Sequence, residues 1–207
     1  MCAPSPLESK AVANIETGDI IYMDGGPFGH IGMAYDAKTV IHAQFKGDFH
    51  KTPNEKMDGG RISYLADGAG TKVFRPPWDK CADAAARKAE LQRVADAIAA
   101  GATYGAYRAA RLLLGSSTFG PGAFGRLMKY RDRYNANKGT PARFAEAGRE
   151  VIKTVTCSEA VIITYQLAFP LGEKPFFIDL DAAHAMPKTL RTWLGANGWT
   201  DLTARVL

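Results

Sequence analysis

Cysteine and histidine are the residue types here that could carry nucleophilic catalysis, and the chain of 207 residues holds three cysteines and four histidines. A thiolate nucleophile needs a histidine that moves the proton and a third polar group that orients that ring. Of the cysteines, Cys157 stands in the most informative setting, the run Thr156-Cys157-Ser158-Glu159. A threonine with a glutamate three residues later, directly before an apolar run, is the capping box of a helix start.

Cys157 is therefore predicted at the first position of a helix that runs to Leu167. The unpaired backbone N–H groups and the positive end of the helix dipole favour a thiolate over a thiol at that position. The same N–H groups could hold the oxyanion of an attacked carbonyl group. The alternative interpretation is a small residue in a first helical turn, because free cysteine is commonly buried and inert.

Two histidines, His30 and His42, lie on neighbouring predicted strands. Side chains alternate along a strand, so His30 shares a face with Gly32 and Ala34. A two-residue turn between the strands would put the histidines on opposite faces, whereas a three-residue loop at 36–38 puts them on the same face and matches the apolar residues. We expect the three-residue loop. We also expect the small-residue face beside the imidazoles to receive the helix that carries the cysteine.

The remaining cysteines and two other histidines have weaker settings. Cys2 belongs to residues 1–16, which we expect to be a flexible tail, and Cys81 to the first turn of a charged surface helix. His50 lies in a segment that is expected to be a charged loop. We assign no catalytic role to any of these three side chains.

A metal site is the alternative use of His184, which follows Asp179 and Asp181 closely. An Asp-Leu-Asp run just before a helix is more simply interpreted as capping. The chain has no Cys-x-x-Cys pair that could hold zinc and no glycine-rich phosphate-binding motif. We therefore expect neither a metal nor a cofactor.

Short strands dominate the first third of the chain and helices the remainder. The strand candidates, which alternate with Gly, Asp and Pro turns, are residues 19–23, 30–35, 39–45, 61–65 and 71–74. Helices are expected at 79–100, 104–114, 157–167 and from about Pro187 to Gly195, with a flexible loop at 115–125. The helix at 157–167 is apolar on all sides, which indicates a buried central helix. This order predicts one α+β domain over residues 1–207, with 79–150 as a helical, basic elaboration.

The net charge of +5 comes from one part of the chain. Residues 126–153 hold eight basic and three acidic side chains, so this segment carries the whole excess. One interpretation is a solvated helical surface, and the other is a docking surface for an anionic polymer. Nucleic acid is the weaker of such partners, because neither a helix-turn-helix nor an RNP-like motif accompanies the charge.

Neither a membrane span nor a secretion signal is evident. The longest uncharged apolar run, residues 160–172, has 13 residues with a proline and is too short to cross a bilayer. The N-terminus lacks the basic start and the apolar core of a signal peptide. We expect no stable membrane insertion and synthesis in the cytoplasm.

Several stretches together resemble a known family, namely Thr17–Tyr22, Gly29–Tyr35, Val40–Ala43 and Thr156–Glu159. They are similar to the NlpC family of papain-like cell-wall peptidases. In that family a Gly-Asp strand leads to a His-Ile/Val-Gly strand with the catalytic histidine, and the third polar residue follows 12 positions later, as His42 follows His30. Here the cysteine comes 127 residues after His30. The chain therefore resembles the circularly permuted branch, with its YiiX/YebB-like hydrolases and, more distantly, lecithin:retinol acyltransferase-like proteins.

The resemblance implies a permuted papain-like fold, an antiparallel sheet packed on a central helix. It implies Cys157 as nucleophile, His30 as base and acid, and His42 as the orienting residue, where many permuted members carry a carboxylate or amide. The implied activity is hydrolysis of an amide bond in peptidoglycan stem peptides. Two alternatives remain: acyl transfer or thioester or lipid-amide hydrolysis at the same site, and a non-enzymatic module that binds polyanions.

Peptidoglycan lies outside the cytosol, so the implied activity needs a route of export. Antibacterial effectors that resemble this branch travel through specialised machines such as type VI secretion. By that resemblance the chain would act in the periplasm of a target cell, and its partners would include secretion machinery or an immunity protein.

Overall fold

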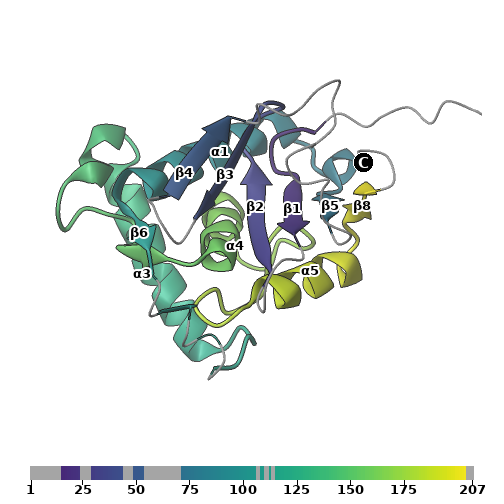
Figure 1. The fold of residues 1–207 in the computed structure, drawn as a ribbon. Coiled ribbons are helices and arrows are strands. Elements are labelled where there is room, and N and C mark those ends of the chain that lie inside the picture. The colour runs from purple at the N-terminus through teal and green to yellow at the C-terminus, as the bar shows by residue number, and fades with distance from the viewer. Residues whose placement is uncertain are drawn as a thin grey trace, which may run out of the picture.

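A computed structural model describes residues 15–23, 29–43, 49–53, 71–105, 108–109, 112 and 115–203, with only the backbone at 49–53. The chain folds as α+β, around an antiparallel six-stranded sheet in the order β4-β3-β2-β1-β5-β8 (Figure 1). Its strands are β1 (Ile20–Met23), β2 (His30–Ala34), β3 (Thr39–Ala43), β4 (Phe49–Pro53), β5 (Lys72–Arg75) and β8 (Thr200–Asp201). A separate parallel pair joins β6 (Thr103–Tyr104) to β7 (Thr154–Val155).

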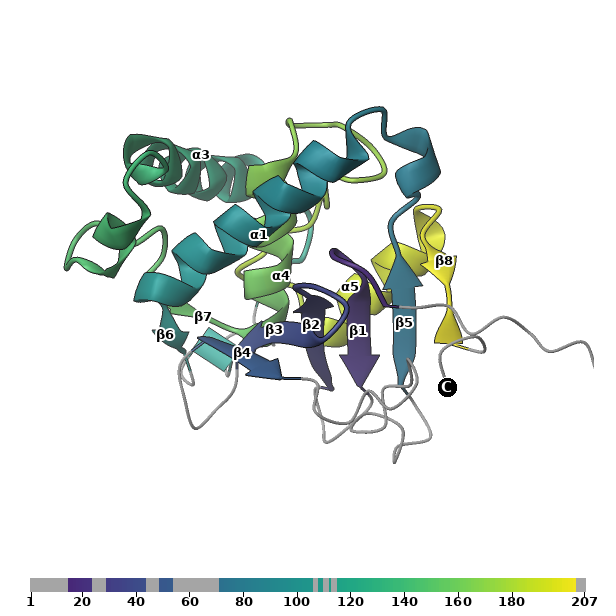
Figure 2. The ribbon, with the colours of Figure 1, turned by 90° about the horizontal axis from the view of Figure 1, so that it is seen from above.

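The helices pack largely on one side of this sheet. They are α1 (Ala84–Gly101), α3 (Pro121–Asn137), α4 (Cys157–Ala168) and α5 (Pro187–Ala196), with short 3-10 turns η2 (Trp78–Lys80) and η4 (Pro141–Ala145). Figure 2 shows α1 and α4 over one face of the sheet, with α3 beyond them. Nearly every residue of α4 is buried, which confirms the predicted central helix. None of the helices in the described ranges has the length and apolar character needed to cross a membrane.

The two faces of the sheet carry different side chains. The face toward the helices presents Tyr22, Ile31, Met33 and Ile41, which pack in one core with residues of α4. Ala34 belongs to a second, smaller cluster on the other face, with residues of β1, β3 and β5. The expectation that α4 lies on the small-residue face is therefore wrong. Large aliphatic side chains bury more apolar area against an apolar helix than Gly and Ala can, so they take the core side.

A tight turn fixes the start of β1. Gly18 has φ +92°, and a Cβ there would lie 2.8 Å from both the Trp78 ring and the Tyr165 hydroxyl. That hydroxyl donates to the Gly18 carbonyl oxygen at 2.5 Å. The next residue, Asp19, is fully buried and receives two hydrogen bonds from Arg75, at 2.9 and 2.7 Å. The Gly-Asp pair thus ties β1 to β5 and α4.

Arginines hold the C-terminal end of α4. Arg131 donates to the carbonyl oxygens of Gln166 and Phe169, each at 2.6 Å, and Arg87 donates to that of Ala168 at 3.0 Å. These are carbonyls that a helix end leaves without an intrahelical donor. The cations also face the negative end of the helix dipole.

Several predicted boundaries differ from the structure. Residues 49–53 form β4 rather than a loop, and His50 pairs with His42 in its register. Tyr104 is in a strand rather than a helix, because its segment completes the parallel pair with β7. The expected loop at 115–125 is helical from Pro121, since proline is favourable in a first helical turn. The predicted strand at 61–65 and residues 1–14 of the predicted tail lie outside the described residues, whereas Ile15 is buried.

Candidate active site

The two histidines of the predicted pair are in contact. The ladder between β2 and β3 pairs Met33 with Ile41 and Ala34 with Val40, which is the register of the three-residue loop. His30 Nε2 lies 3.0 Å from His42 Nδ1, so one ring donates to the other, and the rings meet edge to face. His42 is only 3% exposed. The prediction that both imidazoles share a face is confirmed.

Cys157 begins α4, as the capping box predicts. The Glu159 N–H donates to Thr156 Oγ1, and the Thr156 N–H donates to Glu159 Oε2, both at 3.3 Å. The thiol is 7% exposed and belongs to the core between the helices and the sheet. Burial raises the pKa of the thiol, and backbone N–H groups of Ile31, Ser158 and Cys157 itself, which lie near the sulfur, lower it by less.

A gap in the sheet explains how the Ile31 N–H reaches the sulfur. N–H groups alternate in direction along an antiparallel strand. The Ala34 N–H donates to the Asp19 carbonyl oxygen, on the side of β1, whereas the Tyr35 N–H donates to the Thr39 carbonyl oxygen, on the side of β3. The Ile31 N–H therefore points toward β3, as that of Tyr35 does. However, the ladder between β2 and β3 stops at Met33. The Ile31 N–H thus lies beyond the end of the ladder, near the Cys157 sulfur.

The candidate residues approach this gap from two faces of the sheet. Cys157 comes from the helix side, whereas His30 and His42 project from the opposite face. The sulfur lies near the N–H of Ile31, the residue that follows His30 in β2. Among the described residues, no hydrogen bond joins the sulfur to the His30 ring, whose ring partner is His42.

The titration of both groups follows mainly from burial. Burial raises the pKa of the Cys157 thiol, although the three backbone N–H groups act in the opposite direction. Burial, with repulsion from His42, lowers the pKa of His30 to about 4. The resting forms at neutral pH are thus a thiol at Cys157 and a neutral imidazole at His30. The predicted preference for a thiolate is wrong in this state, because desolvation of the charged sulfur outweighs the helix end.

Tyr104 is a neighbour of the sulfur that the sequence did not reveal. In the parallel pair, Tyr104 lies opposite Val155, two residues before Cys157. The pKa of its phenol is raised by burial and by the charge of an ionised Cys157, so the hydroxyl is within electrostatic reach of the sulfur. Only the pairing of β6 with β7 puts it there, and no local motif marks a two-residue strand.

The carboxylate of Glu159, which completes the capping box two residues after Cys157, is itself buried. Glu159 is 1% exposed and forms an ion pair with Arg108. Burial raises the pKa of Glu159 to about 7, and the Arg108 cation lowers it by less. Burial and the Glu159 charge raise the pKa of the Tyr130 phenol on α3, and the Arg108 cation lowers it by less, so Tyr130 lies near this ion pair. The first turn of α4 therefore packs beside α3 around a buried charge.

The residues considered for metal binding are used otherwise. Asp181 receives two hydrogen bonds from Arg126, at 2.7 and 2.6 Å, and lies 2.8 Å from His184 Nδ1. Asp179 accepts from the Trp193 indole at 2.5 Å and pairs with Lys174 at 2.7 Å. No group of three metal-ligating side chains occurs in the described ranges. The capping interpretation is also wrong, because Met186 is the N-cap of α5 and makes no side-chain cap.

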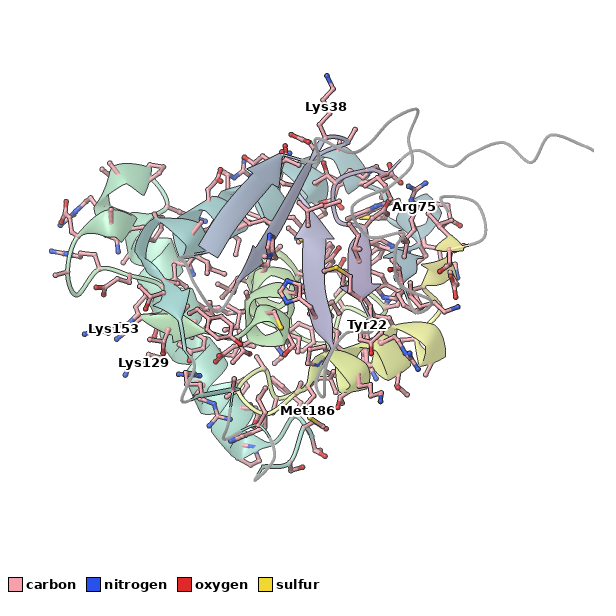
Figure 3. The ribbon with its side chains drawn as sticks, in the orientation of Figure 1. Tyr22, Lys38, Arg75, Lys129, Lys153 and Met186 are labelled. Carbon is pink, nitrogen blue, oxygen red and sulfur yellow. The ribbon has the colours of Figure 1, made fainter. Side chains whose placement is uncertain are left out.

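The basic segment 126–153 divides into two kinds of side chain. Half of its cations bond within the protein: Arg126 to Asp181, Arg131 to the end of α4, Arg133 to the Val151 carbonyl and Arg143 to Glu146. The other half is exposed, and consists of Lys129, Lys138, Arg149 and Lys153. Figure 3 shows Lys129 and Lys153 projecting outward on the side of α3 and β7. The surface available to a polyanion is therefore smaller than the sequence suggests.

Comparisons with known proteins identified no relative of this chain. The chain matches no protein-family model. A search of curated proteins found no match, and neither did a search of solved structures.

Proposed function

We propose that the protein is a cysteine hydrolase that cleaves an amide bond, with Cys157 as nucleophile, His30 as base and acid, and His42 as the orienting residue. The observation that carries the proposal is the imidazole pair, whose ring nitrogens lie 3.0 Å apart, together with Cys157 at the capped start of α4, where the N–H of Ile31 lies near the sulfur. A buried thiol at a capped helix start and a histidine pair on the neighbouring strands supply the three parts of a thiol hydrolase site.

The first half of the reaction forms a thioester. His30, neutral at rest, takes the thiol proton as the sulfur attacks the carbonyl carbon, while His42 holds the ring and faces the resulting imidazolium. Backbone N–H groups at the start of α4 stabilise the oxyanion. When the C–N bond breaks, His30 returns its proton to the leaving amine.

The second half of the reaction restores the enzyme. A water molecule attacks the thioester carbonyl, and His30 now takes the proton from that water. The C–S bond breaks, the thiolate recovers the proton from His30, and the acyl group leaves as a carboxylic acid. No redox or metal chemistry is required by this sequence of steps.

The substrate we propose is the stem peptide of peptidoglycan, reached in the periplasm of a target cell through a specialised secretion machine. Its support is the likeness of the Gly-Asp, His-Ile-Gly, Ile-His-Ala and Thr-Cys-Ser-Glu stretches to NlpC-type peptidases. Exposed Lys129 and Lys153 would add attraction to an anionic wall polymer.

Mass spectrometry of purified peptidoglycan fragments tests this function. The wild-type protein should release new amine and carboxyl termini, and Cys157→Ala and His30→Ala should release none. Cys81→Ala, which removes a thiol outside the site, is the matched control and should cleave as the wild type does. Cleavage by Cys157→Ala at the wild-type rate would contradict the assignment.

A further inference from the structure

A groove on the outer face of α5 has a lining that favours anions. Its volume is about 550 Å³, and it is lined by Leu180, Lys188, Thr189, Arg191, Thr192, Trp193, Ala196 and Asn197. These residues include two cations, an indole and several hydrogen-bonding groups but no carboxylate. The groove of 460 Å³ at the far end of α4 differs, because Asp83 and Glu90 are part of its lining.

The two cations of the α5 groove are not neutralised within the described residues. Lys188 is exposed and forms no ion pair there, and neither does Arg191. The Arg191 guanidinium lies 5.0 Å from the centre of the Tyr22 ring, so its position is fixed without loss of its charge. Asp179, which accepts a hydrogen bond from the lining residue Trp193, already forms an ion pair with Lys174.

The groove is connected to the candidate active site at two points. Ser158, next to Cys157, donates its hydroxyl to the Ala185 carbonyl at 2.6 Å, just before the first turn of α5. Tyr22, beneath Arg191, is the register partner of Ile31, whose N–H lies near the Cys157 sulfur. Figure 3 shows Tyr22 where β1 meets α5, with Met186 at the start of that helix. The start of α5 therefore lies close to the start of α4, which carries Cys157.

We propose that the α5 groove is a substrate subsite that binds a carboxylate of the peptide, with Lys188 and Arg191 as the recognising cations and the Trp193 ring as an apolar wall. This inference rests on the proposed hydrolase function, and it names the chemistry of the substrate: an anionic peptide whose carboxylate lies a few residues from the scissile amide. A cation that has no acidic partner loses no existing ion pair when it binds such a group.

Binding without turnover gives the sharpest test. The Cys157→Ala protein is titrated by calorimetry with a synthetic stem peptide that has free carboxylates, and with the same peptide after amidation. We expect the amidated peptide to bind about tenfold more weakly, as loss of a charge-assisted hydrogen bond implies. Adding Lys188→Gln and Arg191→Gln should weaken binding of the free-acid peptide to the level of the amidated peptide. The same two changes should leave binding of the amidated peptide unchanged.

A matched double variant controls for net charge. Lys38→Gln with Lys80→Gln removes two charges at exposed positions outside the groove lining, and binding of the free acid should stay at the wild-type level; Figure 3 shows Lys38 on the side away from α5. Equal weakening by both double variants, or equal affinity for acid and amide, would overturn the inference. Lys188→Gln alone, at an exposed position, repeats the test if the Arg191 change disturbs folding.

Turnover by the wild-type protein separates this inference from the proposed function. Cleavage of both peptides with the same KM contradicts the α5 subsite and leaves the hydrolase in place. Carboxylate-dependent binding at α5 without any cleavage supports the subsite and contradicts the hydrolase.

Discussion

For the proposed hydrolase, the neutral forms of His30 and Cys157 have a direct kinetic consequence. Burial lowers the pKa of His30 to about 4, and a base must be unprotonated to accept the thiol proton. The acid limb of kcat/KM should therefore have its midpoint near pH 4 rather than near the ordinary histidine value of about 6.5. A pH–rate profile measures this limb, and an NMR titration of the His30 ring is the independent check. A midpoint above pH 6 would contradict the neutral pair.

The reactivity of Cys157 follows from the same burial. Because burial raises the pKa of the thiol, alkylation by iodoacetamide should be slow at neutral pH and should accelerate above about pH 8.5, where free thiols ionise. Peptide mapping by mass spectrometry reports the labelled cysteine, and the Cys157→Ala protein identifies any background. Fast labelling that does not change between pH 5 and pH 8 would show a thiolate–imidazolium pair instead.

At this scale the sequence predicted where the candidate residues lie. The capping box located Cys157, and strand alternation with loop length located His30 and His42 on one face. The titration state was not predictable, because it depends on burial that only the folded core creates. Tyr104 was not predictable either, because its partner strand lies about fifty residues further along the chain.

Among the elements, α4 depends on arginines from two other helices. Arg131 bonds two carbonyl oxygens at the C-terminal end of α4, and Arg131→Met would leave both without a donor. We expect a loss of about 1–3 kcal/mol in the free energy of unfolding. Urea denaturation measures it, with Lys129→Met as the control on the same helix, which should change stability by less than about 0.5 kcal/mol. Equal effects of the two variants would contradict this role.

Helices and strands were predicted correctly where the apolar residues repeat at a clear period. The prediction failed where a segment becomes a strand only because it pairs with another strand. The apolar run of α4 and the proline at the start of α5 gave both helices correctly. β4 has a polar sequence, Phe-His-Lys-Thr-Pro, and becomes a strand because its backbone pairs with the edge of β3. The glycines before and within the first turn of α3 suggest a loop, yet the helix starts at Pro121.

For the whole molecule, two buried groups give opposite dependences of stability on pH. The folded pKa of His30 is lowered from 6.5 to about 4, so stability is lost as pH falls through that range, by roughly 3 kcal/mol. The folded pKa of Glu159 is raised from 4.5 to about 7, so stability is lost as pH rises through that range, by a similar amount. The two effects oppose each other between pH 4.5 and 6.5.

Glu159→Gln should reveal the contribution of His30 alone. The amide cannot ionise, so the variant should gain stability relative to the wild type as pH rises from about 4.5 to about 7. Any constant loss from the broken ion pair with Arg108 shifts the whole curve but leaves its slope. Urea midpoints at several pH values measure the slope, with Glu146→Gln at an exposed position as control. Parallel curves for Glu159→Gln and the wild type would contradict the raised pKa.

The gap between β2 and β3 also has a consequence for how the protein assembles. Before α4 docks, the hairpin is free to extend its ladder by one more pair, Ile31 with Ala43, and to satisfy both backbones with strong N–H···O bonds. Docking of α4 puts the Cys157 sulfur near the Ile31 N–H in place of one of these bonds, so extension of the hairpin ladder and completion of the candidate site compete for the same amide. The Ile31 amide should therefore exchange with deuterium faster than that of Met33, which is one paired position deeper in the ladder.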